Sequence, residues 1–289
     1  MQLSDKMLKD ILVSMRPKQW YKNLVIFIGI IFSINLLNLN LWIEVIAAFT
    51  IFCILSGSIY VLNDILDLEK DKNHPKKKNR PLASGRLKVS HALTSAIILI
   101  FIALTGAYLL NLQFFMVSVA FFILMLVYSF FLKEIIIVDI MVISIGFVLR
   151  AMAGALAIGV YVSPWLIICA FLLALFLALG KRRHELVLLK ENASNHRKIL
   201  GEYSTDMLDQ MINITTSALI MSYSLYTFFS GNIYIMITIP FAFYGLFRYI
   251  FLVHARNMGG EPEMIFKDRG MVISIVLWVI VVVCVLYII

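Results

Sequence analysis

Long apolar runs repeat along the whole chain, and they restrict its fold more than any other feature. Of the 289 residues, 62% are hydrophobic, far more than a soluble domain needs. A run of about 20 apolar residues can cross a bilayer as a helix. We therefore predict an all-α, polytopic membrane protein with nine spans. They lie at about 24–40, 41–62, 89–110, 113–132, 135–158, 162–180, 212–231, 233–253 and 271–289.

The Lys and Arg residues predict how these spans are oriented. Most of the 25 cations fall before the first span or in three long connections, whereas the alternate connections have none. Because loops rich in Lys and Arg stay in the cytoplasm, we expect a cytoplasmic N-terminus in the inner (plasma) membrane. The cytoplasmic catalytic or cap loops are then 63–88, 181–211 and 254–270. The net charge of +8 belongs to one membrane face and does not indicate nucleic-acid binding.

The first 23 residues are predicted to form a cytoplasmic amphipathic segment. Leu8, Ile11, Leu12 and Met15 make one apolar stripe on a helix, as in helices that lie along a membrane surface, and Pro17 ends that helix. No linker is long enough to divide the chain, so residues 1–289 are expected to be a single integral-membrane domain. The three cysteines fall inside spans and are expected to act as small apolar residues.

Three aspartates follow the second predicted span. Asp64, Asp67 and Asp71 are spaced i, i+3, i+7, which places them on one face of a helix. Clustered carboxylates repel one another unless a cation lies between them, and Mg²⁺ binds carboxylate and phosphate oxygens together. We predict a catalytic Mg²⁺–diphosphate site here. The alternative is a solvated helix end whose acids pair with nearby lysines.

A basic loop follows the aspartates, at residues 72–86. Its lysine run, 76–78, could bind phosphates, but loops of this kind also set topology and contact anionic headgroups, and we favour that role for the run. Arg80 is fixed before Pro81, which favours a functional role. Near the last span, Arg248 and the stretch 259–270 form either an interfacial loop or part of a site.

Polar residues at two further spans are also candidates. After the sixth span, Lys181 and Arg182 precede Glu185 by four and three residues, which is about one helical turn. These residues could hold a phosphate or a metal, or form a surface ion-pair network. Inside the fifth span, Asp139 and Arg150 either line a polar cavity or pair with neighbouring helices. The small residues of this span predict close helix packing: Gly146, Ala151, Ala153, Gly154 and Ala155.

Several stretches together resemble the UbiA superfamily of intramembrane prenyltransferases, and most closely its decaprenyl-phosphate phosphoribosyltransferase branch. They are RPKQWYKN (16–23), YVLNDILDLEKDKNHPKKKNRPLASG (60–85), YSFFLKEIIIVDIMVISIGFVLRAMAGA (128–155), LGKRRHEL (179–186) and GGEPEMIFKDRG (259–270). Typical aromatic prenyltransferases carry a second aspartate motif, DxxxD, after the sixth span. Here only Glu185 stands there, beside cations, which suits the phosphoribosyl branch.

The resemblance implies Mg²⁺-dependent transfer of phosphoribose from 5-phosphoribosyl 1-diphosphate to a polyprenyl phosphate, with release of diphosphate. It implies a cell-wall pathway, and a homo-oligomer is a further candidate. In this interpretation the aspartates hold the metal, and the substrate-binding residues are Asn63, Lys18, Lys22, Arg80, Lys133, Arg150, Lys181, Arg182 and Glu185.

Three other functions fit the sequence less well. A UbiA-type prenyltransferase would move an isoprenoid from its diphosphate to an aromatic or other small acceptor, but the second DxxxD is missing. A transporter or channel would place ionisable residues near the membrane midplane, whereas polar residues here crowd one membrane face. A CDP-alcohol phosphotransferase would need a DGxxAR-type run, which this sequence lacks.

Overall fold

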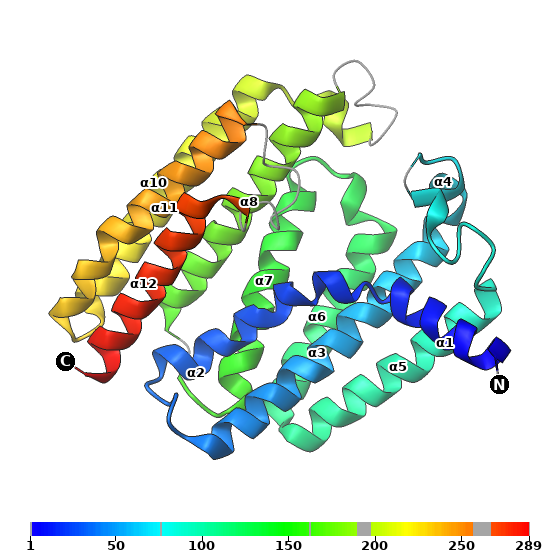
Figure 1. Cartoon of the computed structure of the whole chain (residues 1–289), viewed down its shortest axis with the longest axis horizontal. Helices are drawn as coiled ribbons and strands as arrows, with labels where there is room; N and C mark the ends of the chain where they lie inside the picture. The colour runs from blue at the N-terminus through cyan, green and yellow to red at the C-terminus, as the bar shows by residue number, and fades with distance from the viewer. Residues whose placement is uncertain (1, 76, 162, 190–197, 257–266, 289) are drawn as a thin grey trace. The chain divides into compact units, whose positions relative to one another are not determined.

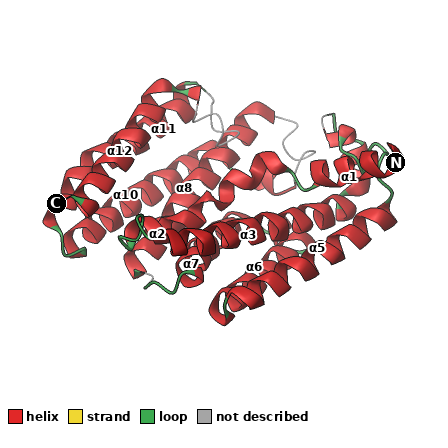
Figure 2. Ribbon diagram, turned by 60° about the horizontal axis from the view of Figure 1, so that its bottom comes forward, coloured by secondary structure: helices red, strands yellow, loops and turns green. Residues whose placement is uncertain are grey.

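The computed structural model describes residues 2–75, 77–161, 163–189, 198–256 and 267–288, and every regular element in those ranges is helical (Figures 1 and 2). The α-helices are α1 (Gln2–Ser14), α2 (Ile28–Phe32), α3 (Leu39–Leu66), α4 (Leu68–Lys72), α5 (Val89–Leu110), α6 (Leu112–Phe130), α7 (Val138–Ala157), α8 (Pro164–Leu189), α10 (Thr205–Phe229), α11 (Ile239–Ala255) and α12 (Arg269–Tyr287). The 3₁₀ helices are η1 (Pro17–Phe27), η2 (Lys77–Asn79), η3 (Leu132–Glu134), η5 (Lys198–Glu202) and η6 (Ile233–Thr238). Lys76 and most of the stretch 259–270 lie outside the described residues.

Seven helices of the described chain are long and apolar enough to cross a membrane: α3, α5, α6, α7, α8, α12 and the continuous η6–α11 segment. Each matches a predicted span. The predicted span 24–40 is instead divided between η1 and the short α2. The predicted span 212–231 lies in α10, which is not among the seven. All-α architecture is therefore confirmed, whereas a count of nine spans is not.

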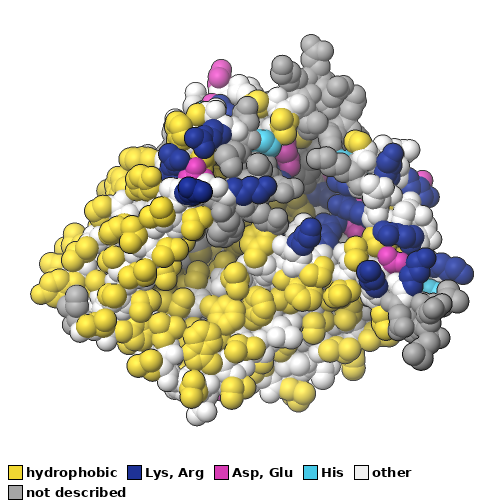
Figure 3. All heavy atoms as spheres, in the orientation of Figure 1, with side chains coloured by type: hydrophobic (Ala, Val, Ile, Leu, Met, Phe, Trp, Pro, Cys, Tyr) yellow, Lys and Arg dark blue, Asp and Glu magenta, His cyan; other side chains and the backbone are white. Residues whose placement is uncertain are grey.

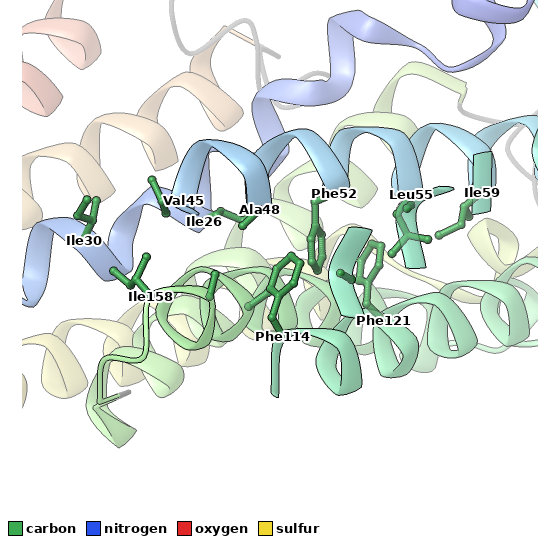
Figure 4. Packing of buried hydrophobic residues seen from close by; sticks show 14 residues of the cluster. Ile26, Ile30, Val45, Ala48, Phe52, Leu55, Ile59, Phe114, Phe121 and Ile158 are labelled. Carbon is green, nitrogen blue, oxygen red and sulfur yellow. The ribbon is translucent and has the colours of Figure 1, made fainter. Parts of the chain in front are cut away.

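The chain forms two compact units, and α7 is divided between them. Unit 1 comprises Met1–Leu132 and Leu149–Tyr161, and unit 2 comprises Lys133–Val148 and Val162–Ile289. In unit 1, α3 packs along α5, α6 and η1. Figure 4 shows the centre of this packing, where Phe52 lies against Phe114 and Phe121 with ring centroids 5.7 and 5.2 Å apart. The single-domain organisation of the sequence stays a prediction.

A close backbone approach ties η1 to the end of α7 within unit 1. A Cβ atom on Gly154 would lie 1.9 Å from the Ile26 carbonyl oxygen, and one on Gly29 would lie 2.8 Å from Cα of Ala155. Only glycine permits backbones to meet at such distances. The close packing predicted from the small residues of this span is therefore confirmed at Gly154 and Ala155.

Unit 2 is built on two helix pairs, α8 with α10 and α11 with α12. Its core contains Phe176 of α8 packed on Tyr249 of α11, with ring centroids 4.8 Å apart. Large apolar side chains also remain on the outside, such as Phe247 and Ile273 at 56% and 58% exposure. Figure 3 shows this hydrophobic surface along α11 and α12, with Lys and Arg gathered at one end of these helices. Apolar residues on both the inner and outer faces are typical of helices that contact lipid.

Candidate active site

The predicted aspartate cluster lies where α3 ends in unit 1. Asp64 is in the last turn of α3 and Asp71 is in α4, and each is only 2% exposed. The continuous helix implied by the i, i+3, i+7 spacing is interrupted at Asp67, which caps α3 and precedes α4. Asn63 Nδ2 donates a hydrogen bond to Asp67 Oδ2 (3.1 Å). Asp64 and Asp71 are thus buried, unlike acids on a solvated helix end, and Asp67 is partly buried.

Two arginines supply the positive charge that these carboxylates need. Arg80 Nη1 donates to Asp64 Oδ1 (3.1 Å) and to Asp71 Oδ2 (2.5 Å), so it joins the two helices. Arg16 Nη2 donates to the same Asp64 oxygen and its guanidinium lies 4.8 Å from the centre of the Tyr60 ring. Lys77 is a more distant partner, 3.9 Å from Asp71.

Arg16 is placed by an uncommon backbone conformation. It has φ 54° and ψ 63°, directly before Pro17 and the start of η1. A non-glycine residue in this left-handed region stores strain, and such residues often occur at functional sites. The contacts of its guanidinium with Asp64 and Tyr60 hold the residue there.

A cavity of about 330 Å³ opens beside this cluster, within unit 1. Its walls combine cations, amides and one carboxylate; they are Val13, Arg16, Gln19, Asp64, Asn79, Arg80 and Pro81. The second oxygen of Asp64, Oδ2, is buried without a hydrogen-bond partner. A buried carboxylate oxygen is costly to leave unpaired, so this atom is suited to bind a cation or a donor group from a ligand.

The donor set fits a magnesium ion that is shared with a phosphate ligand. Among the described residues, no three His, Cys, Asp or Glu side chains are grouped closely enough to hold a metal by themselves. Mg²⁺ in proteins commonly takes one or two carboxylates and completes its shell with substrate phosphates and water. Asp64 and Asp71 could provide the carboxylates, and Arg16 and Arg80 could donate to phosphate oxygens.

The other candidates of unit 1 are spread over several environments. Lys18 is exposed, and Lys22 Nζ donates to Gln19 Oε1 (3.3 Å), which places Lys22 next to a residue of the cavity wall. Arg150 is 6% exposed; its Nε donates to Asn23 Oδ1 (2.8 Å) and its guanidinium lies 4.6 Å from the centre of the Phe121 ring.

A second ionic cluster forms within unit 2. Arg182, 4% exposed, contacts both Glu185 and Asp139, with 3.2 Å between Arg182 Nε and Asp139 Oδ2. Lys181 lies 3.9 Å from Glu185, and the Tyr203 hydroxyl is 3.5 Å from Asp139 Oδ1. Asp139 and Arg150 therefore each have a partner within their own unit. Lys133 lies in η3, half-buried.

Sequence reasoning missed several polar residues that complete these sites. Gln19 and Asn79 line the cavity of unit 1, and Asn23 links Arg150 to Ser56, donating to its hydroxyl at 3.2 Å. In unit 2, Asp209 is bound by Arg183, with Nε–Oδ1 2.5 Å. Gln19 and Asn23 belong to the stretch RPKQWYKN, so only their individual roles were missed. Asn79 likewise belongs to the stretch 60–85. Asp209 has no spacing signal, because its partner Arg183 is 26 positions away in the sequence.

Arg248 joins α11 to the start of α12. Its guanidinium donates to both oxygens of Asp268 (3.0 and 2.9 Å), and Asp268 Oδ1 also accepts the Met271 N–H (2.9 Å), which caps α12. The hydrogen bonds from Arg248, and then the one from the Met271 amide, lower the pKa of Asp268 to about 2. Asp268 therefore stabilises the folded protein mainly in its charged form.

Replacing Asp268 with Asn is expected to lower the Tm at neutral pH and to have less effect in acid. A carboxyl whose pKa falls on folding adds stability above its unfolded pKa of about 3.9. That stability is lost as the pH falls toward the folded pKa, here about 2. Thermal unfolding in detergent should show the difference between wild type and D268N shrinking between about pH 4 and pH 2. A difference that stays unchanged across this window would contradict the prediction.

Comparisons with known proteins agree with this architecture. The family model described as the UbiA prenyltransferase family matches residues 24–267. A decaprenyl-phosphate phosphoribosyltransferase of Corynebacterium glutamicum is 32% identical over 99% of this chain and 88% of its own length. One of Mycobacterium tuberculosis is 30% identical over 92% of this chain and 90% of its own.

A solved structure shows the same fold. The UbiA homolog from Archaeoglobus fulgidus bound to GPP and Mg²⁺ superposes with a TM-score of 0.75, at 18% identity, over 96% of this chain and 99% of that one. With the family match and the long apolar helices, this likeness identifies the class of protein. The chain belongs to the UbiA prenyltransferase family and is a multi-pass membrane transferase.

Proposed function

We propose that the protein transfers phosphoribose from 5-phosphoribosyl 1-diphosphate to a polyprenyl phosphate and releases diphosphate. The observation that carries the proposal is the cavity of unit 1, in which two arginines and two amides surround the buried carboxylate of Asp64. Such a surface suits a sugar that carries a phosphate and a diphosphate. The similarity to two phosphoribosyltransferases over more than nine-tenths of the chain supports this choice of donor.

The metal of this site is proposed to be Mg²⁺, held by Asp64 and Asp71 with Asp67 beside them. When bound, it would neutralise the charge that develops on the departing diphosphate. Asn63 orients Asp67 through its hydrogen bond. Arg80 contacts both Asp64 and Asp71, so it can bind the diphosphate oxygens while it keeps the two carboxylates together.

The reaction replaces one C–O bond with another. The bond between ribose C1 and the diphosphate oxygen breaks, and a phosphate oxygen of the lipid forms the new bond to C1. That oxygen is already anionic, so no strong general base is required. Lys18 is next to the cavity residue Gln19 in sequence, and Lys22 donates a hydrogen bond to it. Both lysines are proposed to bind the lipid phosphate together with Arg16. Lys133, in unit 2, is proposed as a further substrate-binding residue.

In unit 2, Lys181 is proposed as a substrate-binding residue, while Arg182 orients Glu185. Arg182 is buried and contacts two carboxylates, which favours positioning over direct phosphate binding. Arg150 is proposed to position Asn23 and with it η1, through which it would affect substrate binding.

We also propose nine spans with a cytoplasmic N-terminus and a cytoplasmic active site in the inner membrane. The 11 residues of η1 and the 5 residues of α2 together extend about 30 Å, enough to cross the hydrocarbon core. The 25 residues of α10 extend about 37 Å. The whole chain is proposed to act as one domain, and association of several copies stays a prediction.

Prenyl transfer is the second candidate, because the A. fulgidus homolog of the same fold is described as bound to GPP. Both reactions need a metal and a diphosphate donor, and the cavity can hold the diphosphate of either donor. The long similarity to phosphoribosyltransferases and the lack of a second aspartate motif favour phosphoribosyl transfer.

A donor test on the purified protein in detergent separates the two candidates. Radiolabelled phosphoribosyl diphosphate is offered with polyprenyl phosphate, with and without Mg²⁺, and the organic phase is counted. We expect labelled lipid only when Mg²⁺ is present. If no lipid is labelled with a range of acceptors, while a related phosphoribosyltransferase is active in the same assay, the proposal is wrong. Labelled geranyl diphosphate would then be screened with small acceptors.

A further inference from the structure

A groove of about 380 Å³ runs between α11 and α12 in unit 2, and none of its lining residues is proposed above to bind metal or substrate. It is lined by Pro240, Phe241, Tyr244, Gly270, Ile273, Ser274 and Leu277. The Ser274 hydroxyl donates to the Phe241 carbonyl (3.1 Å), so the groove offers a mainly apolar wall. Tyr244, Ile273 and Leu277 are 51%, 58% and 42% exposed, which leaves this wall open on the outer side of the helices.

The groove reaches the end of α12 where Gly270 lies. A Cβ on Gly270 would be 3.1 Å from Tyr244 Oη and 3.3 Å from both Arg248 Nε and Asp268 Oδ1. Because Gly270 has no side chain, nothing at this position separates the groove from the Arg248–Asp268 pair. An occupant of the groove would meet apolar side chains along its length and charged groups at this end.

Among the described residues, cations outnumber carboxylates at that end of the groove. Arg256 Nη1 lies 3.7 Å from Asp268 Oδ2, and Lys267 and Arg269 are exposed on either side of Asp268. Together with Arg248 they give four cations against one carboxylate in the described part of this cluster. Figure 3 shows Lys and Arg side chains gathered here, next to the hydrophobic surface of α11 and α12.

We propose that this groove binds an anionic phospholipid of the bilayer. Its acyl chain lies against Phe241, Ile273 and Leu277, and its phosphate lies at Arg256, Lys267 and Arg269. Both helices are long and apolar enough to cross a membrane, so the groove faces acyl chains, and basic residues at a span end attract anionic headgroups.

This lipid is bound and not consumed. Asp268 is the one carboxylate in the described part of this cluster, and it already accepts hydrogen bonds from Arg248 and from the Met271 amide. The described cluster therefore has no pair of carboxylates with which to hold a metal. The proposal concerns a lipid that stabilises the α11–α12 pair, and it is independent of the reaction proposed above.

The first test is native mass spectrometry of the full-length protein. The probes are phosphatidylglycerol, phosphatidylcholine of the same chains, and polyprenyl phosphate, each added to delipidated protein. We expect phosphatidylglycerol adducts to survive at collision energies that remove phosphatidylcholine. Equal retention of the two phospholipids would overturn the proposal. Displacement of phosphatidylglycerol by an equimolar amount of polyprenyl phosphate would assign the groove to the acceptor lipid instead.

Two variants with matched controls locate the lipid. K267Q/R269Q should reduce phosphatidylglycerol retention about tenfold or more, whereas K9Q/K88Q removes two exposed cations elsewhere and should leave it unchanged. L277W should block the groove, whereas I280W adds the same bulk at a 51% exposed residue that does not line it. If each variant behaves like its control, the bound lipid lies elsewhere and the assignment fails. Gel filtration and thermal unfolding check that each variant is folded.

Discussion

Replacing Asp64 with Asn is expected to lower the rate of transfer by at least about 100-fold, the size of effect seen when one electrostatic contact to a charged transition state is lost. Asn has nearly the same size but has no negative charge. It removes a charge that faces both Arg16 and Arg80 and an oxygen, Oδ2, that has no hydrogen-bond partner in the protein. The measurement is the initial rate of labelled lipid formation at saturating donor.

Glu69→Gln is the matched control for this variant. It makes the same change of charge in the same segment, but the Glu69 side chain is 79% exposed and pairs with Lys72. We expect E69Q to retain wild-type activity. Because breaking a buried ion pair can itself cost about 3–5 kcal/mol, the Tm of D64N must be measured as well. A folded D64N protein with wild-type activity would remove Asp64 from the site.

Replacing Gly154 with Ala is expected to destabilise unit 1 by about 3 kcal/mol or more. The added Cβ would lie 1.9 Å from the Ile26 carbonyl oxygen and 2.6 Å from its carbon. These are backbone atoms, so no side-chain rotation can relieve the overlap, and η1 must move away from α7. We expect a large fall in Tm by thermal unfolding in detergent.

Gly106→Ala is the control for that prediction. Gly106 also lies within a predicted span, in α5, but a Cβ there would be 3.4 Å from the Ile51 side chain, an ordinary contact. Alanine favours helix over glycine by about 1 kcal/mol, so G106A should keep or raise the Tm. Equal behaviour of G154A and G106A would show that η1 is not held against α7 as described.

Helix locations were largely available from the sequence. The predicted span 89–110 coincides with α5, and the prediction 271–289 lies two residues from the bounds of α12. Long apolar runs locate helices well because an unpaired backbone in lipid is too costly. The same rule did not reveal that residues 24–40 divide into η1 and α2, because hydropathy does not distinguish a 3₁₀ helix from an α-helix.

The candidate site was only partly visible in the sequence. The spacing of Asp64 and Asp71 predicted that they lie together, and Arg80 connects them. Spacing did not predict the helix break at Asp67, nor the pairing of Arg16 with Asp64 across 48 positions. Such pairs depend on where separate helices pack, and no local pattern encodes that.

By itself, the sequence determined an all-α membrane protein in which an acidic cluster and a basic loop follow a long apolar helix, because apolar length and charge act locally along the chain. The tertiary structure decided which charges meet. It placed Arg16 and Arg80 on Asp64, Asn23 on Arg150, and Arg182 between Asp139 and Glu185. Burial makes an unpaired charge costly, so packing selects partners that are distant in sequence. Backbone contacts such as that between Ile26 and Gly154 then fix the positions of the helices that carry these charged residues.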